Sequence, residues 1–295
     1  MLRGVGTLAA FGLLAYLLSQ QGWGEVWGSV QRIAWWRFLV AAVLMAVSRL
    51  AVMARWHTLL RAAGVPVPLR QSARITFAGL FAANFLPTTV GGDVVRLALV
   101  LRLGYDKVVA AASLVVDRLV GMAGMGSAAL LGAGTAIGAG DPAGSGERVI
   151  AAASLIGARW VDRVRHIVRR LSAASALWVR SPRGLLAAFG FTWVHQLCIF
   201  GVSWLMLGGM GEGISFWLVG GLWSFTYFVT LLPVSINGLG VQELSMTFIF
   251  SRFGGVSVAA AASAALLVRT LQMLASTPGA AFLPDIVARG GNGER

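Results

Sequence analysis

A long apolar run extends from Val108 to Ile137 and contains only two charged residues, Asp117 and Arg118. As an α-helix this run would be roughly 45 Å long, at about 1.5 Å per residue. The hydrocarbon core of a bilayer is about 30 Å thick, so such a helix would cross it tilted or with one end protruding. The run therefore predicts a membrane-spanning helix that carries an acid and a base at membrane depth.

Other apolar runs indicate further spanning helices. Only 12% of the residues are charged, whereas soluble domains average about 25%, so the chain could not cover a water-facing surface. We predict an all-α, polytopic membrane bundle that occupies residues 1–295 as one membrane domain, with approximate halves 1–137 and 185–295. The additional runs that support this prediction are Phe38–Met53, Leu185–Met210, Val256–Leu283 and the shorter Val5–Leu18.

The N-terminal run, Val5–Leu18, follows Arg3 as the apolar core of a signal peptide would. The residues after it, Ser19–Gly22, give no small-x-small cleavage pattern. We therefore expect an uncleaved first helix.

The net charge of +13 comes from arginine, since Lys107 is the only lysine. Arginine-rich loops of membrane proteins lie in the cytoplasm, which places segments 56–74 and 159–183 inside and the acidic loops 138–147 and 211–213 outside. We expect a plasma or inner membrane protein with a cytoplasmic N-terminus. Anionic lipid headgroups, and not nucleic acid, are the partners that this charge pattern indicates.

The basic segment 159–183 joins the two halves. Within it, apolar residues recur at helical spacing at Trp160, Val164, Ile167 and Leu171. This pattern favours a basic amphipathic helix at 159–171 in the membrane interface, with a plain basic loop as the alternative. Tryptophans near the ends of predicted segments are expected in the interface belt, namely Trp35, Trp36, Trp56, Trp160 and Trp217.

Two apolar stretches, Ile75–Leu86 and Ile214–Leu232, each run into a break rich in proline and glycine. The first break reads LPTTVGGDVVR from Leu86, and the second reads LPVSINGLGVQE from Leu232. Proline resists helix continuation, and glycine adopts backbone conformations that other residues avoid. Non-helical backbone is tolerated at membrane depth only where it is buried in protein or lines a wet cavity. The residues expected to form the breaks are Pro87, Gly91, Gly92, Pro233, Asn237, Gly238 and Gly240.

The segments after the two breaks also match. Each break leads through an apolar run into an Ala-rich helix that carries an arginine, Arg118 in the first half and Arg269 in the second. The positive-inside orientation brings the first break in from the cytoplasm and the second from outside, which predicts two re-entrant segments in inverted repeats. Such repeats are typical of transporters, whose substrate sites lie where the breaks meet.

Charged residues in the membrane cost roughly 2.5–3.5 kcal/mol each on insertion scales, so they usually face a cavity and pair with one another. We predict a central polar cavity in which arginine contacts phosphate. The alternative is that the charges form purely structural ion pairs and that Asp93 and Glu243 only cap the helices after the breaks. Arg49 is a further charge at membrane depth. The predicted substrate-binding residues are Asp93, Arg96, Asp117, Arg118, Glu243 and Arg269.

The sequence has no zinc-type histidine motif, phosphate-binding loop or convincing nucleophile constellation. Cys198 is the only cysteine, which excludes an internal disulfide and leaves a cysteine-based metal site without support. His195 lies among apolar residues and is expected to be packed and hydrogen-bonded. We therefore expect neither a metal nor a cofactor.

Three motifs together resemble the flippase-like family of the lysylphosphatidylglycerol synthase transmembrane region. They are NFLPTTVGGDVVR at Asn84–Arg96, VDRLVG at Val116–Gly121 and LPVSINGLGVQE at Leu232–Glu243. In the family this region is implicated in moving lipids between leaflets, while a separate aminoacyl-transferase domain makes the lipid. The resemblance implies lipid translocation, and we expect no aminoacyl-transferase domain.

The predicted function is therefore that of a lipid flippase or transporter, without enzymatic activity, for an anionic or phosphate-bearing amphiphile. Membrane lipids are the expected partners, and an enzyme encoded elsewhere is a further candidate partner. One alternative is a membrane enzyme that modifies a lipid or polyprenyl phosphate, with Asp93 or Asp117 as base. The other is a non-transporting partner of such an enzyme.

Overall fold

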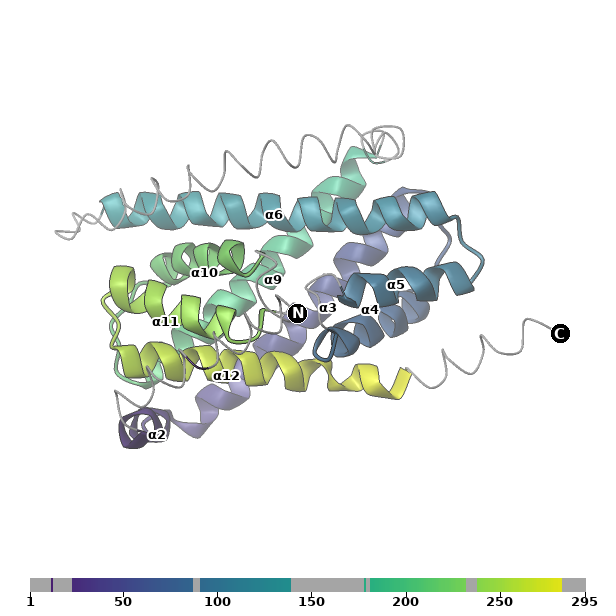
Figure 1. Cartoon of the computed structure of the whole chain (residues 1–295). Coiled ribbons are helices and arrows are strands. Elements are labelled where there is room, and N and C mark those ends of the chain that lie inside the picture. The colour runs from purple at the N-terminus through teal and green to yellow at the C-terminus, as the bar shows by residue number, and fades with distance from the viewer. Residues whose placement is uncertain are drawn as a thin grey trace.

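The computed structural model describes residues 12, 23–86, 91–138, 178, 181–231 and 238–282. Every regular element in these ranges is a helix, which confirms the predicted all-α fold (Figure 1). In chain order the helices are α2 (Trp23–Gln31), α3 (Trp35–Ala62), α4 (Leu69–Ala83), α5 (Gly91–Arg102), α6 (Lys107–Gly138), α9 (Pro182–Gly209), α10 (Phe216–Thr230), α11 (Val241–Gly254), α12 (Val258–Ser276) and the 3-10 helix η2 (Thr277–Ala281).

Four stretches of the described chain are long and apolar enough to cross a membrane. They coincide with the four long apolar runs predicted from the sequence, and they belong to α3, α6, α9 and α12. Their limits are Trp35–Ala62, Lys107–Gly132, Pro182–Gly209 and Val258–Ala281. The predicted run Val5–Leu18, apart from Gly12, and the predicted interfacial helix at 159–171 lie outside the described residues.

The outward face of α3 shows how these helices suit a lipid environment. Leu39, Val43, Val47 and Leu50 are exposed and recur every three or four residues, so they form one apolar stripe along the helix. A continuous apolar surface of this kind is rare in soluble monomers and marks a surface that meets a membrane or a partner. With the hydropathy of the four spans, the stripe supports a membrane location.

The two halves of the chain match helix by helix. α3 and α9 both have 28 residues, and α4 and α10 both have 15. In each half the second helix begins 34 residues after the first, from Trp35 to Leu69 and from Pro182 to Phe216. Each half then continues with a short helix, α5 or α11, and a long helix, α6 or α12. The equal spacing supports the internal repeat predicted from the two breaks.

The halves run in opposite directions through the molecule (Figure 1). The α4–α5 pair lies at the end where α6 begins, and the α10–α11 pair lies at the opposite end, where α12 begins. α6 and α12 are therefore antiparallel, and α3 packs against α9 in the middle of the molecule. The opposite directions of the two halves agree with the predicted inverted repeat, whereas the re-entry of each break, and the side of the membrane from which it enters, remain predictions.

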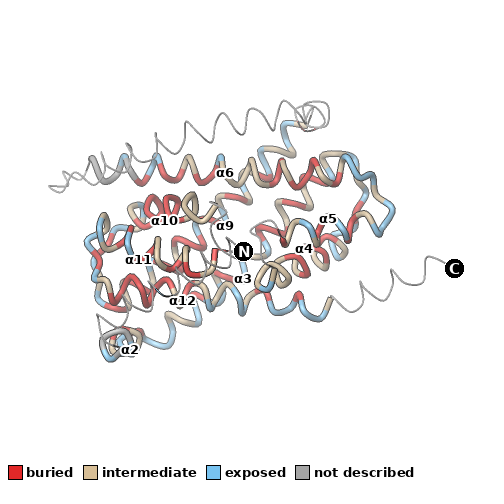
Figure 2. Tube along the Cα trace, viewed as in Figure 1, coloured by how far each residue is buried: buried red, intermediate tan, exposed pale blue. Residues whose placement is uncertain are grey.

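Figure 2 shows buried residues, in red, along α6, α10 and α12. The larger hydrophobic core includes Phe200, Leu222 and Phe250, and it lies against the α10–α11 pair. A second core includes Trp56 and Ile75, and it lies against the α4–α5 pair. Each pair of short helices is therefore anchored by its own core.

The glycines of the two breaks have different roles. Gly238 and Gly240 have φ angles of 70° and 77°, in the left-handed region that glycine adopts without strain, as predicted. Gly91 and Gly92 are instead the first two residues of α5, and Gly92 has no positive φ, so the prediction of an unusual backbone is wrong for Gly92. The other predicted break residues, Pro87, Pro233 and Asn237, lie outside the described residues.

Gly92 is required because α4 and α5 approach each other closely. A Cβ atom at Gly92 would lie 2.7 Å from the carbonyl oxygen of Gly79 on α4. A Cβ atom at Gly79 would lie 2.9 Å from the carbonyl oxygen of Gly92. Both contacts are with backbone, which cannot rotate away as a side chain can. The two glycines therefore set the spacing of this pair of helices.

Replacing Gly92 by alanine is expected to lower the free energy of unfolding by about 1–3 kcal/mol, because the added methyl group forces α4 and α5 apart. Thermal unfolding of the purified protein in a non-ionic detergent measures the loss. Gly190→Ala in α9 is the matched control, since a Cβ atom there meets nothing within 4 Å. Equal unfolding temperatures for the two variants would show that the α4–α5 pair tolerates a wider spacing.

Candidate substrate site

A cavity of about 320 Å³ lies where the two pairs of short helices approach each other. Asn84 and Asp93 line it from the α4–α5 side, and Thr230 and Gln242 line it from the α10–α11 side. Side chains of α3, α6, α9 and α12 complete the wall. The cavity is therefore located between the two pairs of short helices, in the region where inverted repeats of transporters have their substrate sites.

The described residues that line this cavity are strongly basic, with five arginines against two carboxylates. The arginines are Arg49, Arg55, Arg96, Arg118 and Arg269, and the carboxylates are Asp93 and Asp117. Five of the six predicted substrate-binding residues thus line one cavity. The sixth, Glu243, lies beside it, with Oε1 3.7 Å from Nε of Arg269.

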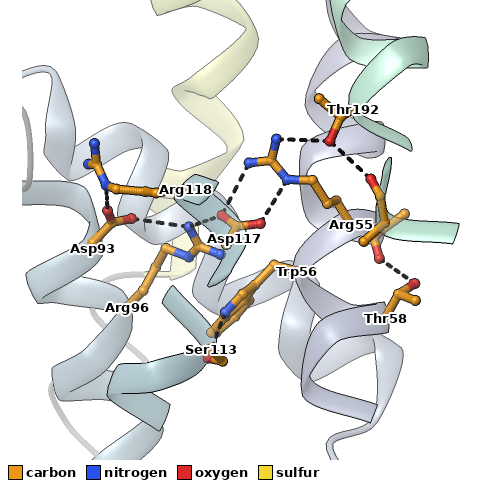
Figure 3. A network of polar contacts seen from close by, with 11 residues as sticks. Arg55, Trp56, Thr58, Asp93, Arg96, Ser113, Asp117, Arg118 and Thr192 are labelled. Atoms are coloured by element: carbon orange, nitrogen blue, oxygen red, sulfur yellow. Dashed lines mark hydrogen bonds and ion pairs between the residues drawn. The ribbon is translucent and has the colours of Figure 1, made fainter. Parts of the chain in front are cut away.

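Asp117 of α6 is the centre of a charged network (Figure 3). Arg55 of α3 binds it with two nitrogens: Nε donates to Oδ1 at 2.7 Å and Nη2 donates to Oδ2 at 3.1 Å. Arg96 of α5 donates through Nη1 to Oδ2 at 3.3 Å. Asp117 and Arg96 are almost fully buried, at 3% and 6% exposed. One carboxylate thus connects three helices of the first half.

Asp93 extends the network to Arg118 (Figure 3). Its Oδ1 accepts a hydrogen bond from Nη1 of Arg96 at 3.1 Å, and its Oδ2 accepts one from Nε of Arg118 at 2.5 Å. Asp93 also stands in the first turn of α5, where a negative charge is favoured by the helix dipole. Both of its oxygens nevertheless contact arginine, so Asp93 does more than cap the helix.

The second half repeats this ion pair in a looser form. Asp93 and Glu243 are each the third residue of their short helix, and Arg118 and Arg269 are each the twelfth residue of the long helix that follows. The pair in the first half is 2.5 Å apart, whereas Nε of Arg269 is 3.7 Å from Oε1 of Glu243. Glu243 also caps α11, since its Oε2 accepts a hydrogen bond from the amide of Gly240 at 2.8 Å. Capping and pairing are therefore both correct for Glu243.

Sequence reasoning misses two residues of the network, Arg55 and Trp56. The sequence places Arg55 at the border of a cytoplasmic loop and Trp56 in the interface belt. α3 instead continues to Ala62, and Trp56 is fully buried with its ring 4.2 Å from Cζ of Arg96. The belt prediction is therefore wrong for Trp56. The apolar pair Leu59 and Leu60, three residues beyond Trp56, is the sequence signal that could have predicted a longer helix. Both residues are fully buried.

His195 lies on the cavity wall, and its Nδ1 is 2.7 Å from Oγ of Ser48. This is the hydrogen-bonded, packed histidine predicted from its apolar neighbours. Within the described ranges, no three His, Cys, Asp or Glu side chains lie close enough together to hold a metal ion.

The amino-acid sequence matches a known family of membrane proteins. The family model of the lysylphosphatidylglycerol synthase transmembrane region matches residues 4–279. The chain belongs to this family. The lysylphosphatidylglycerol synthase transmembrane region is a membrane region associated with lipid handling, and the match spans both halves and every residue of the cavity wall. No curated protein matches the chain.

Proposed function

We propose that this protein moves an anionic or phosphate-bearing amphiphile between the leaflets of a plasma or inner membrane. The observation that carries the proposal is the cavity lining, in which the described residues include five arginines against two carboxylates where the two pairs of short helices meet. Each charge at membrane depth costs roughly 2.5–3.5 kcal/mol on insertion scales, and a bound anion offsets the excess positive charge. Membership of a family associated with lipid handling supports a lipid as the ligand.

In this proposal the headgroup enters the cavity while the acyl tails stay in lipid. Arg118 and Arg269 contact the phosphate, because guanidinium groups match phosphate oxygens in charge and geometry. Asp93, Arg96 and Glu243 shape the cavity. The two inverted halves alternate access by rocking about the site, with the N-terminus in the cytoplasm.

Arg118 is the ion-paired arginine best placed to meet a ligand. Its side chain is 33% exposed, whereas those of Arg55 and Arg269 are 11% and 12% exposed. Its partner Asp93 also keeps Arg96, so removing Arg118 leaves that carboxylate with a counter-charge. Replacing Arg118 therefore distinguishes a role in ligand binding from a structural role more clearly than replacing the other ion-paired arginines.

The contacts of the two aspartates favour transport over the enzyme alternative. A general base needs a carboxylate oxygen directed at the proton it removes. Both oxygens of Asp117 accept hydrogen bonds from Arg55, and Oδ2 accepts one from Arg96 as well. Both oxygens of Asp93 accept hydrogen bonds from arginine too. Arginines, and not acids, are the groups that this cavity offers to a ligand.

A reconstitution assay tests the proposal. Purified protein is placed in liposomes with a fluorescent phosphatidylglycerol, and movement between leaflets is followed by chemical quenching of the outer label. Wild type is expected to equilibrate the label, and Arg118→Gln is expected to slow the initial rate by about tenfold, the equivalent of one lost charged hydrogen bond. Arg252→Gln, at an exposed position on α11, is the matched control and should retain the wild-type rate.

Mass spectrometry of lipids that stay bound after gentle purification supplies a second readout. One anionic lipid enriched in wild type and lost in Arg118→Gln supports the site. A wild-type protein that moves no more label than empty liposomes, and retains the same lipid mixture as Arg118→Gln, contradicts the proposal and favours a non-transporting partner protein.

A further inference from the structure

The arginines of the cavity fall into two groups with different surroundings. Arg55, Arg96 and Arg118 each place a nitrogen within 3.3 Å of a carboxylate oxygen. These three are held by the network around Asp93 and Asp117. Arg49 and Arg269 line the same cavity from α3 and α12 and lie outside that network.

Arg49 has the least compensated charge of the five. Within the described residues it makes no ion pair, in contrast to the other four arginines. Its hydrogen bond to the described part of the chain is long, from Nη2 to the backbone oxygen of Gln272 at 3.5 Å, and its Nε is buried without an acceptor there. It also experiences the positive charge of Arg269. An isolated guanidinium at membrane depth is unfavourable unless an anion meets it.

Gln242 adds a second buried donor to the same wall. Its Oε1 accepts a hydrogen bond from Nη1 of Arg269 at 3.1 Å, and its Nε2 is buried with no partner among the residues that the structure describes. A guanidinium can only donate, so the amide oxygen must face Arg269 and the NH2 group must face elsewhere. The orientation of this amide is therefore fixed, and it leaves a donor that needs an acceptor.

Glu243, the nearby carboxylate, is engaged elsewhere. Its Oε2 accepts a hydrogen bond from the amide of Gly240 at 2.8 Å, and its Oε1 stays 3.7 Å from Nε of Arg269. It makes no ion pair with Arg49. This wall of the cavity thus contains two guanidinium groups, from Arg49 and Arg269, and the amide donor of Gln242. The nearby carboxylate of Glu243 is already hydrogen-bonded to Gly240.

We propose that Arg49, Gln242 and Arg269 form an oxyanion subsite that holds the phosphate group of the transported molecule, an inference that rests on the proposed function. A phosphate presents several acceptor oxygens and few or no donors, which matches a wall in which the Nε of Arg49 and the Nε2 of Gln242 are buried donors without an acceptor among the described residues. The network around Asp117 forms the opposite wall, and Arg118 contacts the same phosphate from that side. The ligand chemistry is a phosphate oxyanion, carried by a lipid or free in solution.

Binding to the full-length protein in a maltoside detergent tests the subsite. The probes are dihexanoyl phosphatidic acid, inorganic phosphate and dihexanoylglycerol, which lacks phosphate, and affinity is read from the concentration dependence of the unfolding temperature. Phosphatidic acid is expected to stabilise wild type, and dihexanoylglycerol is not. Arg49→Gln is expected to weaken binding at least about tenfold, which corresponds to about 1.4 kcal/mol.

Gln242→Glu is the sharper variant. It keeps the oxygen that accepts from Arg269 but replaces the free NH2 with a negatively charged oxygen. The variant is expected to fold, because it supplies the two arginines with a carboxylate, and to lose phosphate binding through charge repulsion. Arg252→Gln is the control outside the cavity and should bind like wild type.

The outcomes separate the two proposals. Stabilisation by both phosphatidic acid and inorganic phosphate supports a general oxyanion subsite, and stabilisation by phosphatidic acid alone supports a lipid phosphate. If Gln242→Glu and Arg49→Gln bind phosphatidic acid like wild type, the subsite is wrong even if the wild-type protein moves lipid. If wild type neither binds phosphatidic acid nor moves labelled phosphatidylglycerol, the proposed function itself fails.

Discussion

The Asp117→Asn variant is expected to lose about 3–5 kcal/mol of unfolding free energy, the range found when one partner of a buried ion pair is removed. Arg55 and Arg96 both donate to this carboxylate, and their side chains are only 11% and 7% exposed. Asparagine has nearly the same shape but no charge, so both guanidiniums lose their shared counter-ion. Asp93 is then the only carboxylate left in the network, against three arginines.

Unfolding of purified protein by increasing SDS in mixed detergent micelles, followed by tryptophan fluorescence, measures this effect. Asp106→Asn is the matched control. Asp106 is exposed and accepts a hydrogen bond from the amide of Val109, and asparagine caps a helix about as well as aspartate. The control is expected to unfold like wild type. If Asp117→Asn does so too, the network contributes little to stability and its role is confined to the ligand.

Gly132→Val is expected to lower the free energy of unfolding by about 3 kcal/mol or more, the upper range for overpacking. A Cβ atom at Gly132 of α6 would lie 2.5 Å from Cα of Gly221, 2.7 Å from its nitrogen and 2.8 Å from the carbonyl oxygen of Trp217. All three atoms belong to the backbone of α10. The two helices must therefore separate to admit any side chain, and α10 would move away from the cavity wall that it helps to form.

The same unfolding titration measures this loss, and lipid movement in liposomes reports the effect on the site. Gly134→Val is the matched control, since it makes the same change two residues further along α6, where a Cβ atom meets nothing within 4 Å. We expect the control to remain folded and active. Similar stability for both variants would show that the contact of α6 with α10 is not a tight one.

The spans and their order could be predicted from sequence because both depend on local composition. In lipid, a run such as Val108–Ile137 is stable as a helix, because its backbone N–H and C=O groups then form hydrogen bonds with one another. The matching positions of Arg118 and Arg269 were visible in the same way, because each follows its break at a similar distance. Five of the six predicted site residues accordingly line one cavity.

Other parts of the site depend on packing that no local pattern records. Arg55 and Asp117 are 62 residues apart, and nothing near Arg55 indicates that a carboxylate will meet it. The role of Gly92 follows from its distance to Gly79, which only the packing of α4 on α5 defines. Hydropathy also defines the end of a helix only to within several residues. The predicted run ends at Met53 and α3 ends at Ala62, and Arg55 and Trp56 lie between these two positions.

The sequence separation of Arg55 and Asp117 has a consequence for biosynthesis. The chain is made from its N-terminus at about 5–20 residues per second, so roughly 3–12 s pass between the synthesis of α3 and that of the acid in α6. During that interval Arg55 has no Asp117 to pair with, and an arginine in hydrocarbon draws water or moves toward the headgroups. α3 can therefore settle at its final depth only after α6 has been made. A nascent chain that stalls before Asp117 would therefore lack the counter-ion that compensates Arg55 in the folded protein.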